Sequence, residues 1–425
     1  DLAAMKLLNF FFGIYLLIGV FLASSYLIFP KAIIQFLSKF DDQIINDNVR
    51  IIYFTSPLCI LIFATSHLND VLIMHHYFVS GALLSILTNL FSIISIFLFH
   101  VNLGVSSIIL GMVFGYFLYL LCQLFILQKK LRWNFFLYSF DLQKNMKRNI
   151  LFSQSGYLFS NIAHYLANPI LSGFGPGILS SYNFSYKIVN LFNSTLIAHF
   201  SNITGIKFNE LFAETDKEKL YVLFLKTIKY LLFILVPISF FLCLFSMEIV
   251  ALLFERGAFD KFSADRSSQF LKFLSLTLPF LAVNTLVSRV FIAKKLIKQS
   301  SASQILINLI NILFLFSMTS LIGPLGIALA ALITNLVNMA LWVGFTRIFF
   351  KELPFFKVLI YMMKIFILNF FIAFCVLAFK KLFLFASSHL FILIISFCIY
   401  FLLIICCIYL LTRKREKTIL SDITI

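Results

Sequence analysis

The stretch LGIALAALITNLVNMALWVGFT, residues 325–346, decides the fold class, because its 22 consecutive residues carry no charged side chain. A helix rises about 1.5 Å per residue, so this stretch is long enough to cross a hydrocarbon core of roughly 30 Å. The whole chain has the same character. It is 61% hydrophobic and 12% charged, whereas soluble globular chains are about 45–50% apolar and about 25% charged. The sequence therefore predicts a polytopic membrane protein.

Further stretches of this kind occur along the whole chain, and twelve are long and apolar enough to be membrane spans. An isolated strand cannot satisfy its backbone groups in lipid, so the predicted fold is all-α with 12 transmembrane helices. The predicted spans lie near residues 8–29, 51–72, 77–99, 104–127, 150–172, 178–204, 221–243, 264–290, 301–321, 325–346, 357–379 and 385–411.

The loops between these spans differ in their basic charge. One set of alternate loops holds nineteen Lys and Arg residues and the other set holds eight. Short basic loops stay in the cytoplasm, so both ends of this chain are predicted to be cytoplasmic. Loop charge next to anionic lipid headgroups explains the net charge of +17 without a nucleic acid partner. Residues 128–149 mix bases with aromatic residues, a pattern typical of an interfacial amphipathic linker that forms a helix on the membrane.

An internal repeat organises the spans. The stretch LGVSSIILGMVFGYFLYLL begins 222 residues before the quoted one and aligns with it, which pairs Gly104 with Gly326. In the preceding span the same offset pairs Asn89 with Asn311. Such repeats are common in transporters. We therefore expect two pseudo-symmetric lobes, the first with four of its six spans in this chain. The predicted domains are an N-terminal lobe remnant, the cytoplasmic linker, a C-terminal lobe, and a final helix pair with a basic tail: 1–127, 128–149, 150–346 and 347–425.

The sequence offers no catalytic or metal centre. Its seven cysteines lie in apolar runs without CxxC or Cys/His spacing. Sixteen of the seventeen acidic residues fall in loops, termini or span borders, and only Asp70 lies inside a span. A membrane enzyme acting on polyprenyl phosphate would have only His75 and His76, beside Asp70, to work with. We predict no catalytic residue, no metal and no cofactor.

Span 178–204 carries a polar stripe. Asn183, Lys187, Asn190 and Ser194 follow the spacing i, i+4, i+7, i+11, which places them on one helix face. Lys187 stands nine residues past the outer end of the span, roughly 13 Å deep. A charge at that depth costs at least ~2.5 to 3.5 kcal/mol, so Lys187 is a candidate functional residue.

The preceding span repeats this spacing with four further residues, just before Pro169. They are Tyr157, Asn161, His164 and Asn168. The two stripes fit either the walls of one water-filled cavity or polar contacts between helices, worth about 0.6 to 2 kcal/mol each. Cations and amides without a carboxylate suit an anionic, hydroxyl-rich ligand such as a phosphate-linked sugar. They do not suit a cation or drug exporter, because the charge has the wrong sign.

The stretch ALLFERGAFD predicts a short amphipathic turn at the outer surface. Glu255 and Arg256 would reach water and Gly257 would end the helix. We expect Ser263 to cap the next span, with Asp265 in its first turn. A gating role for this turn is the alternative.

Four stretches carry a resemblance to a known family: ALLFERGAFD (251–260), SYNFSYKIVNLF (181–192), FIAKKLIKQSSASQILINLINILF (291–314) and GPLGIALAALITNLVNMALW (323–342). They resemble the MurJ/MviN family of lipid II flippases, within the multidrug/oligosaccharidyl-lipid/polysaccharide transporter superfamily. The resemblance implies a transporter rather than an enzyme, with fourteen helices in two six-helix lobes and a final pair. The spans of this chain would be the third to fourteenth. The likeness follows span order along nearly the whole chain.

The resemblance also implies a mechanism. Lipid II would cross the bacterial inner membrane from the cytoplasmic to the periplasmic leaflet by alternating access through a cationic central cavity. Lys187 matches the cavity arginine of the family and would contact the pyrophosphate. Tyr186 replaces an acidic residue often found there, so a local ion pair is not carried over. The final pair, 357–379 and 385–411, resembles helices that form a lipid-tail groove.

The implied partners are a lipid-linked glycan pyrophosphate, membrane lipids and cell-wall synthesis proteins. A flippase for another lipid-linked oligosaccharide, such as an O-antigen, capsule or exopolysaccharide unit, is the alternative function.

Overall fold

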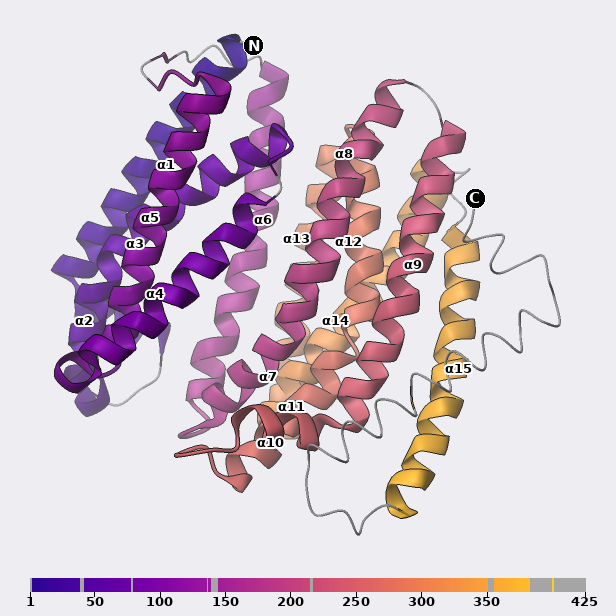
Figure 1. Cartoon of the computed structure of the whole chain (residues 1–425). Helices are drawn as coiled ribbons and strands as arrows, with labels where there is room; N and C mark the ends of the chain where they lie inside the picture. The colour runs from indigo at the N-terminus through magenta and orange to yellow at the C-terminus, as the bar shows by residue number, and fades with distance from the viewer. Residues whose placement is uncertain are drawn as a thin grey trace. The chain divides into compact units, whose positions relative to one another are not determined.

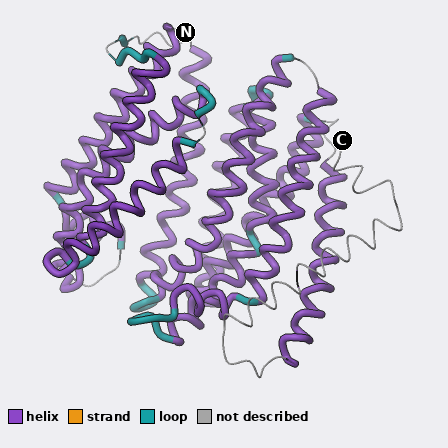
Figure 2. Tube along the Cα trace, viewed as in Figure 1, coloured by secondary structure: helices purple, strands orange, loops and turns teal. Residues whose placement is uncertain are grey.

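The protein is described by a computed structural model. The described residues are 2–38, 42–77, 79–135, 137–138, 144–214, 217–350, 355–382 and 400. They form fifteen α-helices and no strand, which confirms the all-α prediction (Figure 2). The chain divides into two compact units, residues 1–147 and 148–425.

The first unit is built around four long helices. α1 packs on α3, and α3 and α4 both pack on α5 (Figure 1). Gly111 and Gly115 of α5 allow its backbone to approach α4, because a Cβ on Gly115 would lie only 2.6 Å from the Thr88 Cα. Small residues at such contacts are typical of membrane helices. The helices of this unit are α1 (Leu2–Ile28), α2 (Pro30–Leu37), α3 (Asp42–Met74), α4 (Ser80–Leu103) and α5 (Ser106–Leu131).

The second unit has one large apolar core. Leu231 of α9 and Val283 and Leu286 of α12 are fully buried in it. α6 (Lys144–Ser172) begins in the last residues of the first unit and continues into the second. The other helices are α7 (Ile178–Phe192), the π-helical turn Asn193–Ala198, α8 (His199–Ala213), α9 (Lys217–Leu244), α10 (Ser246–Phe254), α11 (Lys261–Ser275), α12 (Leu278–Ala293), α13 (Ile297–Ile322), the 3₁₀ turn Gly323–Leu325, α14 (Gly326–Phe349) and α15 (Phe355–Leu382).

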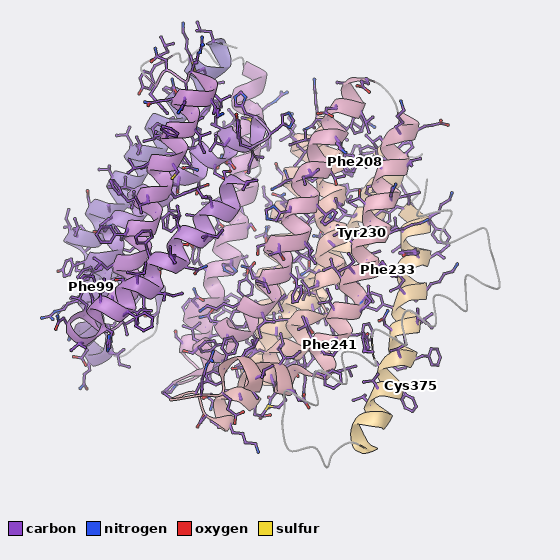
Figure 3. The ribbon with its side chains drawn as sticks, in the orientation of Figure 1. Phe99, Phe208, Tyr230, Phe233, Phe241 and Cys375 are labelled. Atoms are coloured by element: carbon purple, nitrogen blue, oxygen red, sulfur yellow. The ribbon has the colours of Figure 1, made fainter. Side chains whose placement is uncertain are left out.

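The numerous phenylalanines serve both the core and the surface. Phe208 of α8 is fully buried, whereas Phe99 and Phe233 expose 39% and 37% of their area (Figure 3). Exposed rings on long apolar helices fit contact with lipid. The phenylalanines therefore give packing and lipid-facing bulk and do not mark a site by themselves.

Seven helical segments in the described residues are long and apolar enough to cross a membrane, or eight if the bent pair α11–α12 is one span. The chain is therefore a multi-pass membrane protein, but the predicted count of twelve spans is not confirmed. Eleven of the predicted spans fall on helices, and span 385–411 lies outside the described residues apart from Tyr400. Two predicted spans are interrupted: 178–204 contains the π-helical turn, and 264–290 bends by 41° between α11 and α12.

The linker 128–149 differs from its prediction, because its described part contains no helix of its own. α5 continues to Leu131 and α6 begins at Lys144. Between them, Asn9 of α1 accepts a hydrogen bond from the Trp133 indole at 2.8 Å. Its amide also donates to the carbonyls of Asn134 and Leu137, at 2.7 and 2.9 Å. Asn9 thus satisfies backbone groups that a helix would otherwise pair.

The order of elements agrees with the internal repeat. The offset of 222 carries α4 onto residues 302–325 and α5 onto 328–353, close to the bounds of α13 and α14. Each unit also has a short helix after a long one, α2 after α1 and α10 after α9. Both short helices follow a phenylalanine N-cap of similar backbone conformation, Phe29 with φ −123° and Phe245 with φ −107°.

Candidate functional site

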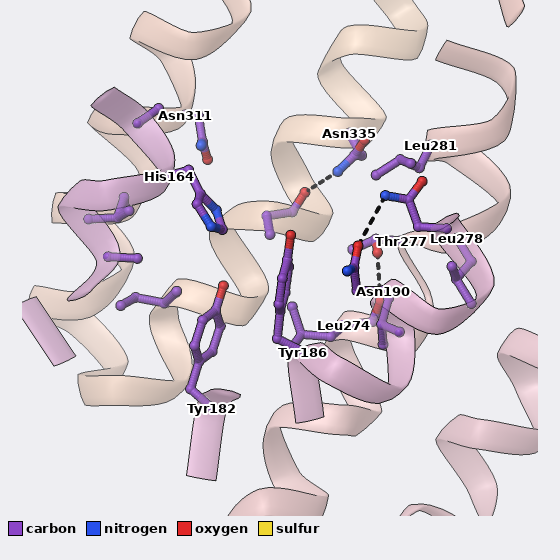
Figure 4. Close-up of a pocket in the computed structure, with 17 residues that line it drawn as sticks. His164, Tyr182, Tyr186, Asn190, Leu274, Thr277, Leu278, Leu281, Asn311 and Asn335 are labelled. Carbon is purple, nitrogen blue, oxygen red and sulfur yellow. Dashed lines mark hydrogen bonds between the residues drawn. The ribbon is translucent and has the colours of Figure 1, made fainter. Parts of the chain in front are cut away.

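A pocket of about 150 Å³ lies within the second unit (Figure 4). α6, α7, α11, α12, α13 and α14 supply its walls, together with the start of the π-helical turn. None of its seventeen lining residues is acidic, Lys or Arg. Its polar groups are amides, hydroxyls and one imidazole, and they include His164, Tyr186, Asn190, Thr277, Asn311 and Asn335. Such a lining can donate hydrogen bonds to a polar ligand and accept them from it, but it supplies no lysine, arginine or carboxylate charge.

Two irregularities in the helices border this pocket. The π-helical turn begins at Asn193, and the break between α11 and α12 exposes Thr277 to the pocket. Pro279 stands in the first turn of α12, where its missing N–H is tolerated. The buried Ser239 hydroxyl donates to the Ser275 carbonyl at 2.8 Å, which supplies a partner where the helix is broken. Broken helices in membrane proteins usually occur where they line a cavity.

Amide groups connect the pocket to the surrounding helices. Asn284 of α12 donates its amide to the backbone oxygen and to Oδ1 of Asn335, at 3.1 and 3.2 Å. Thr334 donates to Oδ1 of Asn311 at 3.1 Å, which joins α14 to α13. Asn284, Asn311 and Asn335 were not among the predicted site residues. Each is an amide within an otherwise apolar span, and Asn311 also takes part in the internal repeat, but neither feature predicts a pocket.

The predicted stripe on α7 lies on one exposed side of the helix. Asn183, Lys187, Asn190 and Ser194 are all exposed, with Ser194 in the π-helical turn. Ser185, on the opposite side, is fully buried. Asn190 also lines the pocket, whereas Lys187 does not. The Lys187 ammonium lies 5.5 Å from the centre of the Phe184 ring.

Of the described side chains in the predicted stripe on α6, one lines the pocket. The His164 ring lines the pocket and lies 5.5 Å from the Tyr186 ring of α7. Asn161 is exposed and Asn168 is half-buried. The Tyr157 side chain lies outside the described residues. Of the two predicted stripes, the structure therefore brings His164 and Asn190 together at the pocket, and the binding roles of all these residues stay predictions.

The turn after α10 reaches the surface, but the helix ends before Gly257 and not at it as predicted. α10 ends at Phe254, and Glu255, Arg256 and Gly257 are exposed. Gly257 has φ +61°, a left-handed conformation that glycine adopts without strain. The chain can therefore reverse here between α10 and α11.

The predicted cap of the next helix is wrong. Asp260, not Ser263, is the N-cap of α11, and its carboxylate accepts the Ser263 N–H at 2.8 Å. α11 begins at Lys261, so Asp265 lies beyond the first turn. Hydrogen bonds from the side chain and backbone of Ser263 hold the pKa of Asp260 below its usual value.

The two histidines predicted beside Asp70 lie at the end of α3. His75 and His76 follow the end of α3 and are exposed, and Asp70 lies on that helix. In the described part of the chain, no group of three or more His, Cys, Asp or Glu residues could hold a metal ion.

The family model described as lipid II flippase MurJ matches residues 3–402. The chain belongs to the MurJ family. A relative in this family, the probable lipid II flippase MurJ of Aquifex aeolicus (strain VF5), is 23% identical over 329 residues, which are 76% of this chain and 65% of that protein. The chain thus spans less than two thirds of the length of this relative.

Solved structures share the MurJ-family fold. Lipid II flippase MurJ in an inward closed conformation has a TM-score of 0.74 at 21% identity, over 96% of this chain and 84% of that one. A MATE protein in complex with MaL6 has a TM-score of 0.64 at 16% identity, over 83% and 81% of the two chains. An outward-facing MATE family transporter of the MOP superfamily has a TM-score of 0.62 at 17% identity, over 79% and 76%.

Proposed function

We propose that this MurJ-family protein is a lipid II flippase. It moves the polyprenyl-pyrophosphate-linked peptidoglycan precursor from the cytoplasmic to the periplasmic leaflet of the bacterial inner membrane, by alternating access, with both ends of this chain in the cytoplasm. The observation that carries this proposal is the match of the lipid II flippase family model to residues 3–402. The same match favours lipid II over another lipid-linked oligosaccharide.

The exposed side of α7 suits the charged part of this substrate. A pyrophosphate requires a cation that the protein leaves uncovered, and Lys187 is exposed on this side. Asn183 and Asn190 flank it at helical spacing and can hydrogen-bond the phosphate oxygens or the neighbouring sugar. Lys187 therefore binds the pyrophosphate, and the amides on either side of it orient the bound group.

The pocket lining supports a transport role for the second unit. Transporters place substrate and ion sites where helices are discontinuous. The break between α11 and α12 and the π-helical turn after α7 both border this pocket. His164 and Asn190 belong to the two polar stripes and also line the pocket. Movement of the helices at these irregular segments therefore changes the side chains that surround the substrate.

Complementation tests this function. The full protein should restore growth to a bacterial strain depleted of its own lipid II flippase. Lys187→Ala should abolish this growth while the amount of protein in the membrane, measured by immunoblot, stays normal. Lys187→Arg keeps the charge and should retain growth. Lys364→Ala removes an exposed lysine from another predicted span and serves as the matched control.

Each outcome decides a separate point. Normal growth with Lys187→Ala at normal protein levels would remove Lys187 from the mechanism. Failure of the unmutated protein to restore growth, together with rescue of an O-antigen or capsule flippase mutant, would assign the chain to another lipid-linked glycan.

A further inference from the structure

We propose that Phe184, held by the outer turn, positions the Lys187 ammonium for the substrate. This inference rests on the proposed function, and it adds a positioning residue and a role for the stretch ALLFERGAFD. The turn between α10 and α11 then supports this part of α7 from outside the binding site.

Three phenylalanine rings connect the turn to α7. The Phe184 ring centre lies 4.8 Å from that of Phe254, the last residue of α10, and 5.0 Å from that of Phe259, just before α11. Phe254 and Phe259 are themselves 5.9 Å apart. The rings of Phe184 and Phe259 meet edge to face, at 84°, which is a favourable aromatic geometry. Residues on both sides of the exposed Glu255–Gly257 segment therefore fix one ring of α7.

The same half of α7 is fastened to α11 by independent contacts. The fully buried Ser185 hydroxyl donates to the Ser267 carbonyl at 2.5 Å. The rings of Tyr182 and Phe270 also meet edge to face, with centres 5.7 Å apart. Because Ser185 directly follows Phe184, these contacts set both the rotation of α7 and the direction in which Phe184 projects.

Lys187 lies one helical turn beyond Phe184, and its ammonium is 5.5 Å from the ring centre. This distance is within the range of about 6 Å in which the negative face of an aromatic ring attracts a cation. A lysine side chain has four rotatable bonds and many conformations when exposed. The ring reduces the number of these conformations, so the ammonium is held on the exposed side of α7 before a phosphate arrives.

The interaction can be weakened without changing the shape of the cluster. Fluorine withdraws electrons from the ring. This weakens the negative electrostatic potential of the ring face, which attracts the cation, while the ring stays apolar and similar in size. We therefore replace Phe184 by phenylalanine with one, two or three fluorines. If the ring only packs against Phe254 and Phe259, this series has no effect on lipid II binding.

The experiment uses the full protein in proteoliposomes that contain lipid II. Initial translocation rates are measured as a function of the lipid II fraction. The apparent KM should rise stepwise with each fluorine, to a total of about two- to five-fold, and kcat should stay constant. Phe184→Trp keeps a strong cation-binding face and should retain a KM near the original. The same fluorinated series at Phe259, which packs in the cluster beside Phe184, should show no trend.

The outcomes separate this inference from the proposed function. An unchanged KM across the Phe184 series, in a protein that loses transport on Lys187→Ala, would overturn the positioning role alone. Equal trends at Phe184 and Phe259 would also overturn it, because they would report on packing. Absence of lipid II translocation by the unmutated protein would instead overturn the proposed function.

Discussion

Asn284 donates one amide group to two oxygens of Asn335, the backbone carbonyl at 3.1 Å and Oδ1 at 3.2 Å. This pair joins α12 to α14 beside the pocket, which Asn335 lines (Figure 4). Asn284 is only 6% exposed, so its amide has little access to water if this contact is lost. The pair therefore links the stability of the helix packing to the shape of the pocket.

A double-mutant cycle measures this link. Asn284→Ala and Asn335→Ala should each lower the free energy of unfolding in detergent. Their coupling energy should be about 0.6 to 1.7 kcal/mol, the range for hydrogen bonds between membrane helices. Unfolding is followed by loss of helical circular dichroism in a denaturing detergent. Additive effects of the two substitutions would show that the hydrogen bonds do not stabilise the fold.

The glycines of α5 allow a second test of the helix packing. A Cβ on Gly111 would contact the carbonyl oxygen of Phe91 and lie 2.5 Å from the Ser92 Cα. Backbone atoms cannot move aside as a flexible side chain can, so Gly111→Ala should push α4 and α5 apart and cost about 1 to 3 kcal/mol. Gly13→Ala is the matched control, because no atom beyond its chain neighbours and its own helix backbone lies within 4 Å of the added carbon. Thermal unfolding midpoints compare the two, and equal midpoints would contradict the close approach.

The cap of α11 should respond to pH. Hydrogen bonds from Ser263 lower the pKa of Asp260 from its usual 3.8 in the folded state. The charged carboxylate is therefore the stabilising form. Its contribution is fully present above about pH 4 and is lost as the pH falls through the lower pKa of the folded protein. The protection factors of the first amides of α11 against hydrogen exchange should fall in this range.

Two variants check the cause of this pH dependence. Asp260→Asn keeps an N-cap side chain and should retain protection without the pH dependence. Asp260→Ala should lose protection at every pH. A pH dependence that persists in Asp260→Asn would assign the effect to another group.

The sequence was sufficient to predict that the chain is a membrane protein and that one side of α7 carries a polar stripe. A charged content of 12% excludes an ordinary soluble fold. The spacing of Asn183, Lys187, Asn190 and Ser194 requires only local helix geometry, which the structure retains through α7 and into the π-helical turn. Periodicity identifies a face of one helix, and here that information was sufficient.

The pocket could not be predicted in the same way. Asn284, Asn311 and Asn335 come from three helices, and only tertiary packing brings them together. The cap of α11 was misassigned for a different reason. Asp260 and Ser263 are both strong N-cap residues, and hydropathy placed the start of the span at residue 264, later than the helix itself. The structure shows that the helix extends beyond the apolar segment.

The last prediction concerns the break between α11 and α12. Ser239 of α9 is fully buried, and its hydroxyl donates to the Ser275 carbonyl at the end of α11. Ser239→Ala leaves this carbonyl buried without that donor, which should cost about 1 to 3 kcal/mol and loosen the break next to the pocket. Ser317→Ala is the control, because it removes an exposed hydroxyl that bonds only within its own helix. Unfolding free energies and hydrogen exchange at residues 274–281 measure both effects. If Ser239→Ala matches Ser317→Ala in both, the hydroxyl does not hold the broken helix in place.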